Sequence, residues 1–157
     1  MDNRVSTIHF LLKRLGAWLL AVAIAYVLAS VTATLSVIDS LTDMGLAVPA
    51  ADRVNMALQD ILGMANMFLP MVAFALLMAF MTAALLCRWF ARWRLPLYAL
   101  AGAAGLVTIH LALNLAFGLT PIAIGRSVGG LALQGLAGAV GGICYILLVR
   151  NQSAGDW

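Results

Sequence analysis

The chain has 157 residues, of which 64% are hydrophobic and only 10% charged, and its mean hydropathy is +1.04. This composition excludes an intrinsically disordered chain and a soluble domain, because neither can keep so much apolar surface away from water. The net charge of +3 does not indicate nucleic-acid binding, since the basic residues are divided among the ends of apolar runs and form no single cluster.

A helix that crosses a bilayer needs about 20 apolar residues, and four runs in the chain are long enough. They cover residues 15–38, 61–87, 95–119 and 122–149. We therefore predict an all-α integral membrane protein, a four-helix transmembrane bundle whose single membrane domain covers residues 1–157. The first run also resembles a secretory signal with a cleavage site near residue 33, but its length favours a retained span.

Basic residues are unevenly divided between the two ends of these spans. With a cytoplasmic amino terminus, only Arg53 and Arg126 lie outside. The inner side then holds the other seven: Arg4, Lys13, Arg14, Arg88, Arg92, Arg94 and Arg150. Cytoplasmic loops of membrane proteins carry an excess of Lys and Arg, so we predict that both termini are cytoplasmic. We expect a bacterial inner membrane.

Residues 39–60 form the longest segment outside the predicted spans. After Pro49, the apolar residues Val54, Leu58 and Ile61 recur at helical spacing, with polar residues between them. This pattern predicts an outer amphipathic segment that runs as a helix into the second span. It serves either as a connector resting on lipid or protein, or as a lid over the bundle.

Polar residues are rare within the spans, and five of them are predicted to lie toward the outer side. Asn66 begins the second span, and His110 and Asn114 lie in the outer part of the third. A tight turn at Thr120-Pro121 brings Arg126 to a similar depth in the fourth, and Gln134 follows deeper in the same helix. Unpaired polar groups are costly in hydrocarbon, so these side chains should face protein, either as a network that fastens helices or as an outward-facing cavity.

Glycines occupy much of the surface of the fourth span. The stripe contains Gly130, Gly138 and Gly142, and neighbouring stripes add Gly125 and Gly129. Small residues at four-residue spacing allow helices to approach closely in a membrane, whereas glycine without such a contact only weakens a helix. We predict that these glycines form helix-packing surfaces.

The sequence offers little support for catalysis. Cys87 and Cys144 have no partner at metal-ligand spacing, and no serine or cysteine forms a nucleophile motif with His110. His9 is predicted to lie in the cytoplasm or at the inner surface and His110 in the outer part of the membrane, so they cannot ligate one haem. We expect no enzyme activity, no cofactor and no metal site.

Two functions remain. We favour a small membrane protein that acts non-enzymatically by helix–helix association through the glycine faces of its third and fourth spans, as a homo-oligomer or as an accessory subunit of a membrane complex. The alternative is a small transporter or channel, whose polar cavity of Asn66, His110, Asn114, Arg126 and Gln134 binds an anionic small molecule or a lipid headgroup. The expected partners are membrane lipid and another membrane protein or a second copy, and not nucleic acid.

Overall fold

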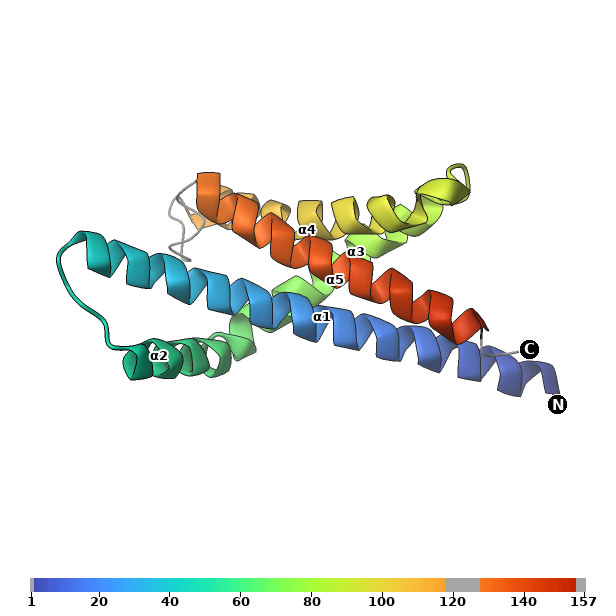
Figure 1. The fold of residues 1–157 in the computed structure, drawn as a ribbon. Coiled ribbons are helices and arrows are strands. Elements are labelled where there is room, and N and C mark those ends of the chain that lie inside the picture. The colour runs from blue at the N-terminus through green and yellow to red at the C-terminus, as the bar shows by residue number, and fades with distance from the viewer. Residues whose placement is uncertain (1, 118–127, 155–157) are drawn as a thin grey trace.

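The computed structural model describes the backbone of residues 2–117 and 128–154, and the side chains of residues 8, 11–113, 115 and 129–150. The described elements are all helical (Figure 1). In chain order they are α1 (Asp2–Asp43), α2 (Ala50–Gly63), α3 (Ala65–Leu86), the short 3₁₀ helix η1 (Ala91–Trp93), α4 (Arg94–Phe117) and α5 (Val128–Ala154). Four stretches of these helices are long and apolar enough to cross a membrane: Leu11–Asp43, Ala65–Leu86, Ala91–Leu113 and Gly129–Arg150. The predicted fold class, an all-helical membrane protein with four spanning helices, is confirmed.

The four long helices form a ring in which each contacts two neighbours. Helix α5 packs against α4 on one side and α1 on the other, while α3 packs against α4 and more weakly against α1. Helix α2 lies alongside the later part of α1, and the amino and carboxyl ends of the chain lie at the same end of the bundle (Figure 1). This up-and-down order gives every helix an apolar neighbour on two sides.

The segment predicted as an outer loop is largely helical. Helix α1 continues to Asp43, which gives it 42 residues and a length of roughly 63 Å at 1.5 Å per residue, well beyond the thickness of a bilayer core. Gly45 then ends the helix with a left-handed backbone, φ +82°. The Leu46 N–H bonds to the Leu41 carbonyl at 3.0 Å, the pattern of a Schellman C-cap.

Helix α2 does not run unbroken into the second span as the sequence pattern predicted. The two helices meet at a bend at Met64, and α3 begins at Ala65. Near this bend the Tyr26 hydroxyl of α1 donates a hydrogen bond to the Ile61 carbonyl. This hydrogen bond helps to hold the end of α2 against α1. Pro70, within α3, leaves the Asn66 carbonyl without its usual helical partner.

The buried core changes in character along the bundle. Small residues of α1, including Ala21, Ala25 and Ala29, are fully buried and let α5 approach. Toward the end that holds the termini, Phe80 stacks on Tyr145 with ring centroids 4.7 Å apart, and Tyr98 packs against both rings. The core at that end of the bundle is therefore aromatic and tightly filled.

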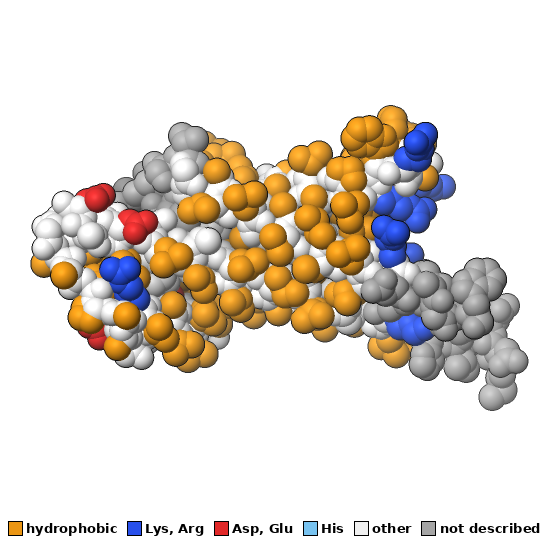
Figure 2. All heavy atoms as spheres, in the orientation of Figure 1, with side chains coloured by type: hydrophobic (Ala, Val, Ile, Leu, Met, Phe, Trp, Pro, Cys, Tyr) orange, Lys and Arg blue, Asp and Glu red, His pale blue; other side chains and the backbone are white. Residues whose placement is uncertain are grey.

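Charge is separated between the two ends of the molecule. On the visible face, Lys and Arg side chains gather at the end where the termini lie, while Asp side chains lie at the other end with one basic group (Figure 2). A broad apolar band covers the surface between them. This pattern fits a protein that crosses a bilayer.

Candidate functional site

The five residues of the predicted cavity do not share one environment. Gln134 and His110 are buried, at 0% and 3% exposure, whereas Asn66 is exposed at the start of α3. Asn114 belongs to α4, but its side chain lies outside the described residues, as does Arg126 entirely. The structure therefore brings two of the five into the bundle interior.

Gln134 connects α5 to α1. Its Nε2 donates to the Ala29 carbonyl at 2.9 Å and also lies 3.3 Å from the Thr32 hydroxyl oxygen. The Ala29 carbonyl only accepts, so the amide orientation is determined and Oε1 points elsewhere. That oxygen is buried and has no hydrogen-bond partner among the described residues.

His110 is held by its own helix and by an aromatic neighbour. Its Nδ1 lies 3.0 Å from the Leu106 carbonyl oxygen, and because a carbonyl oxygen only accepts, Nδ1 carries a proton. The imidazole packs edge-on against Phe68 of α3, with ring centroids 5.9 Å apart, and Phe68 in turn contacts Tyr26 of α1. The Nε2 atom is buried and has no partner in the described part of the chain.

Ser30 of α1 is a third buried polar side chain in this region. It is fully buried, and its hydroxyl likewise has no partner among the residues described. Ser30, His110 and Gln134, which we call the polar layer, each lie 16 residues along their own helix from a basic residue near the end that holds the termini: Arg14, Arg94 and Arg150. Gln134 bonds to α1 at Ala29, the residue before Ser30, so these two side chains lie at a similar level. The contact between Gly102 and Gly138 places His110 about one helical turn farther from the end that holds the termini.

A hydrogen-bonded pair connects the polar layer with the end of the bundle where α2 lies. One turn beyond Ser30, the Thr34 hydroxyl donates to Asp60 Oδ2 of α2 at 2.6 Å and is 3.1 Å from the Ser30 carbonyl oxygen. Thr34 is buried, whereas Asp60 is partly exposed. The partly exposed Asp60 carboxylate therefore lies about one helical turn beyond Ser30 along α1.

Several glycines of α5 pack against other helices of the same chain. A Cβ atom placed on Gly138 would overlap the Gly102 carbonyl of α4, and one placed on Gly142 would overlap the Tyr98 carbonyl. Gly141 faces α1, where a Cβ would come within 2.9 Å of the Ala25 methyl. These positions require glycine because the backbones of two helices touch there.

The other predicted packing glycines differ from one another. Gly130 is buried, whereas Gly129 is exposed and a Cβ there would meet nothing within 4 Å, so Gly129 takes part in no close helix contact in the described structure. Gly125 lies outside the described residues.

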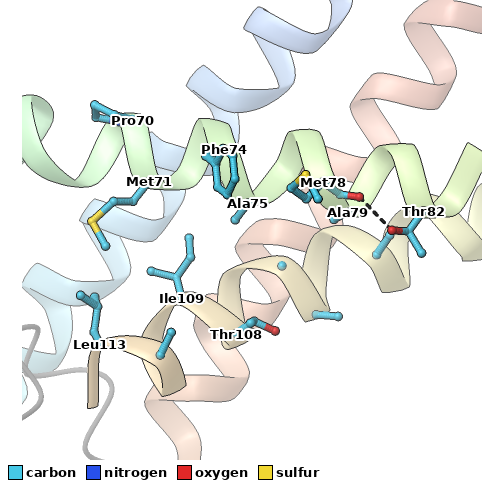
Figure 3. A pocket seen from close by; sticks show the side chains of 14 residues that line it. Pro70, Met71, Phe74, Ala75, Met78, Ala79, Thr82, Thr108, Ile109 and Leu113 are labelled. Atoms are coloured by element: carbon cyan, nitrogen blue, oxygen red, sulfur yellow. Dashed lines mark hydrogen bonds between the residues drawn. The ribbon is translucent and has the colours of Figure 1, made fainter. Parts of the chain in front are cut away.

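A surface groove lies between α3 and α4. Its volume is ≈ 810 Å³ and nearly all of its surface is apolar (Figure 3). Small residues of both helices line much of it: Ala75, Ala79, Ala101, Ala104, Gly105 and Ala112. Larger side chains, among them Phe74, Met78 and Leu113, form its sides. The groove lies within the spanning helices and opens toward the region of the lipid.

Several of these residues were missed in the sequence analysis. Ser30 and Thr34 are four residues apart and so share one face of the first span, which was a readable signal for a polar stripe on that helix. The groove left a weaker signal, because alanines at four-residue spacing are common in membrane helices. No sequence pattern indicates which two helices leave a space between them.

The chain matches no protein-family model, and comparisons with curated proteins and with solved structures find no similar protein. Its possible activities must therefore be argued from its own geometry. Within the described residues, no group of three or more His, Cys, Asp or Glu side chains is placed to hold a metal ion. The polar layer can offer hydrogen bonds, and the groove can offer an apolar surface for close packing.

Proposed function

We propose that this protein acts without chemistry of its own, by associating with another transmembrane helix that packs into the α3–α4 groove. The observation that carries this proposal is the groove itself, an apolar hollow of ≈ 810 Å³ floored by small residues of two spanning helices. In lipid there is little hydrophobic driving force between helices, so association depends on close van der Waals packing. A lining of alanine and glycine lets a third helix approach closely, although less closely than α5 approaches α4, where glycine backbones touch.

The glycine faces that the sequence analysis assigned to association between molecules serve another purpose. Gly102, Gly138 and Gly142 are already in contact within one chain. The small residues that still face outward are those of the groove, such as Ala104 and Ala112, which are exposed. We therefore assign the contact with a partner to the groove.

Helix α3 is suited to such a contact because it is the least enclosed of the four spanning helices. Of the most apolar 18-residue stretch of α3, only 22% is buried within the bundle, whereas 50% of the corresponding stretch of α1 is buried. Phe74 and Met78, which border the groove, are 67% and 51% exposed. A partner helix would cover these side chains. The partner is a second copy of the chain or another membrane protein.

The transporter or channel hypothesis has less support. Between the polar layer and the end that holds the termini, the interior is filled by Leu76 and Leu106, both fully buried, and then by the aromatic cluster around Phe80. These side chains leave no polar path along the bundle axis within the described residues.

Substitution within the groove tests the association. Ala104→Phe fills the groove, and Leu100→Phe adds a similar ring on the exposed side of α4 outside it, as a matched control. Two differently tagged copies are expressed together, purified in mild detergent and examined by native mass spectrometry, which detects both self-association and a co-purified partner. We expect Ala104→Phe to reduce the associated fraction about tenfold or more, the effect of about 1.4 kcal/mol, while Leu100→Phe leaves it unchanged. Equal association of both variants, or a wild-type protein that is always alone, would contradict the proposal.

We further propose that the end holding the termini is cytoplasmic, in a bacterial inner membrane. The concentration of Lys and Arg at that end supports this orientation (Figure 2). In a variant without Cys87 and Cys144, single cysteines replace Met44 or Ala91, both exposed and at opposite ends of the bundle. An impermeant maleimide added to intact cells should label position 44 and not position 91, and the reverse pattern would invert the assignment.

A further inference from the structure

The turn between α3 and α4 carries basic and aromatic side chains at the end of the bundle that holds the termini (Figure 1). Residues 88–94 include three arginines and three large aromatic residues: Arg88, Trp89, Phe90, Arg92, Trp93 and Arg94. All six are exposed, and the exposed fractions of Trp89 and Trp93 are 82% and 62%. We propose that this segment, which we call the basic–aromatic turn, binds the phosphate headgroups of anionic phospholipids in the adjoining leaflet of the membrane.

Backbone hydrogen bonds keep the basic–aromatic turn compact. The Trp89 N–H bonds to the Leu86 carbonyl at 3.1 Å, and the Trp93 N–H bonds to the Phe90 carbonyl at 3.0 Å. Each of these bonds joins residues three apart, and the Cα atoms at the two ends of such a turn lie within about 7 Å of each other. The arginine and aromatic side chains therefore project from one small area of the surface and not from a long loop.

The turn is placed at the depth of the lipid headgroups. The apolar stretch of α3 that could cross a membrane ends at Leu86, and the next such stretch starts at Ala91, so only residues 87–90 separate the two. The headgroup layer on each side of the hydrocarbon core is roughly 5–7 Å thick, and so short a turn keeps its side chains within reach of that layer. Tryptophan is enriched at this depth because its ring is apolar and its N–H is polar.

No acidic side chain among those described balances the arginines of the turn. The four described aspartates lie at the opposite end of the molecule, two at the end of α1 and two on α2: Asp39, Asp43, Asp52 and Asp60. A phosphate group supplies the missing negative charge, and its oxygens accept paired hydrogen bonds from a guanidinium group. A soluble anion would leave the aromatic rings exposed to water. An anionic lipid matches both kinds of side chain, because it carries its phosphate next to apolar acyl chains.

The test measures which lipids the full chain retains. The protein is reconstituted in bilayers of equal amounts of phosphatidylglycerol, which is anionic, and phosphatidylcholine, which is zwitterionic, with identical acyl chains. It is then released in mild detergent, and native mass spectrometry counts the bound lipids of each kind. We expect the anionic lipid to be retained in at least about tenfold excess, since each arginine near an anionic surface contributes about fivefold, the effect of about 1 kcal/mol. Equal retention of the two lipids would overturn the proposal.

Three substitutions that each remove one positive charge locate the site. Arg92→Gln acts within the turn and should reduce the excess of anionic lipid about fivefold. Arg150→Gln acts at the same end of the bundle, near the end of α5, which Figure 1 shows apart from the turn, and should change the excess less than about twofold. Arg53→Gln acts on α2 at the opposite end and should leave it unchanged.

The comparison of Arg92→Gln with Arg150→Gln decides between a site on the turn and the summed charge of that end. Both side chains are exposed, so neither substitution is expected to disturb the folded bundle. A loss confined to Arg92→Gln would support the site. Equal losses for the two variants, or no loss for either, would show that the turn has no preference of its own and would overturn the proposal.

Discussion

The two sides of α4 are packed in different ways. Toward α5, glycines bring the two backbones into contact at Gly102 and Gly138 and again at Tyr98 and Gly142. Toward α3, Gly105 makes a tight contact without backbone overlap, with a Cβ position 3.3 Å from the Ala79 methyl, and beside it the two helices part to form the groove. One helix thus has a closed interface and an open one.

This difference shows how small residues serve two purposes in a membrane helix. Where small residues of two neighbouring helices face each other, as between α4 and α5, they hold the helices of one chain together and are not exposed to a partner. Where they face a gap, as Ala104 and Ala112 do, they remain available to a third helix. Composition is similar on both sides of α4, so the pairing of the helices decides the role.

The largest expected effect comes from breaking the closed interface. In Gly138→Ala the new methyl group would overlap the Gly102 carbonyl, which no change of rotamer can relieve. We expect a loss of unfolding free energy of about 3 kcal/mol, at the upper end of ordinary overpacking. The measurement is unfolding by a denaturing detergent, followed by circular dichroism.

Gly16→Ala is the control for this substitution, because Gly16 lies in α1 with nothing within 4 Å of its Cβ position. That variant should be unchanged or more stable by up to roughly 1 kcal/mol, since alanine is the better helix former. Equal stability of Gly138→Ala and wild type would mean that the backbones do not touch at this point.

A smaller effect is expected at the open interface. In Gly105→Ala the methyl group would lie 3.3 Å from the Ala79 methyl and 3.4 Å from the Ala75 carbonyl oxygen, so α3 needs to move by only a few tenths of an ångström. The gain in helix propensity, roughly 1 kcal/mol, should offset this shift, and the net change should stay within about 1 kcal/mol in the same assay. A loss as large as that of Gly138→Ala would show that α3 and α4 are as rigidly joined as α4 and α5.

Part of the site could be argued from sequence and part could not. The high cost of a lipid-facing amide or imidazole placed Gln134 and His110 inside the bundle before any helix was positioned. The same argument also placed Asn66 against protein, and there it was wrong: the Asn66 side chain is exposed, because a residue at the end of a spanning helix can reach polar surroundings. It also gave no partner for Gln134, which bonds to Ala29 of α1, a helix more than 100 residues away in the chain.

Hydropathy by itself determined that this chain is helical and has four helices long and apolar enough to cross a membrane, because each such helix must satisfy its own backbone and carry about 20 apolar residues regardless of its neighbours. The tertiary structure alone decided which glycines meet, where α3 and α4 separate, and that Gln134 bonds to α1 at Ala29. These outcomes depend on the order of the helices around the ring and on their vertical offsets. Such quantities belong to pairs of helices, and no single stretch of sequence contains them.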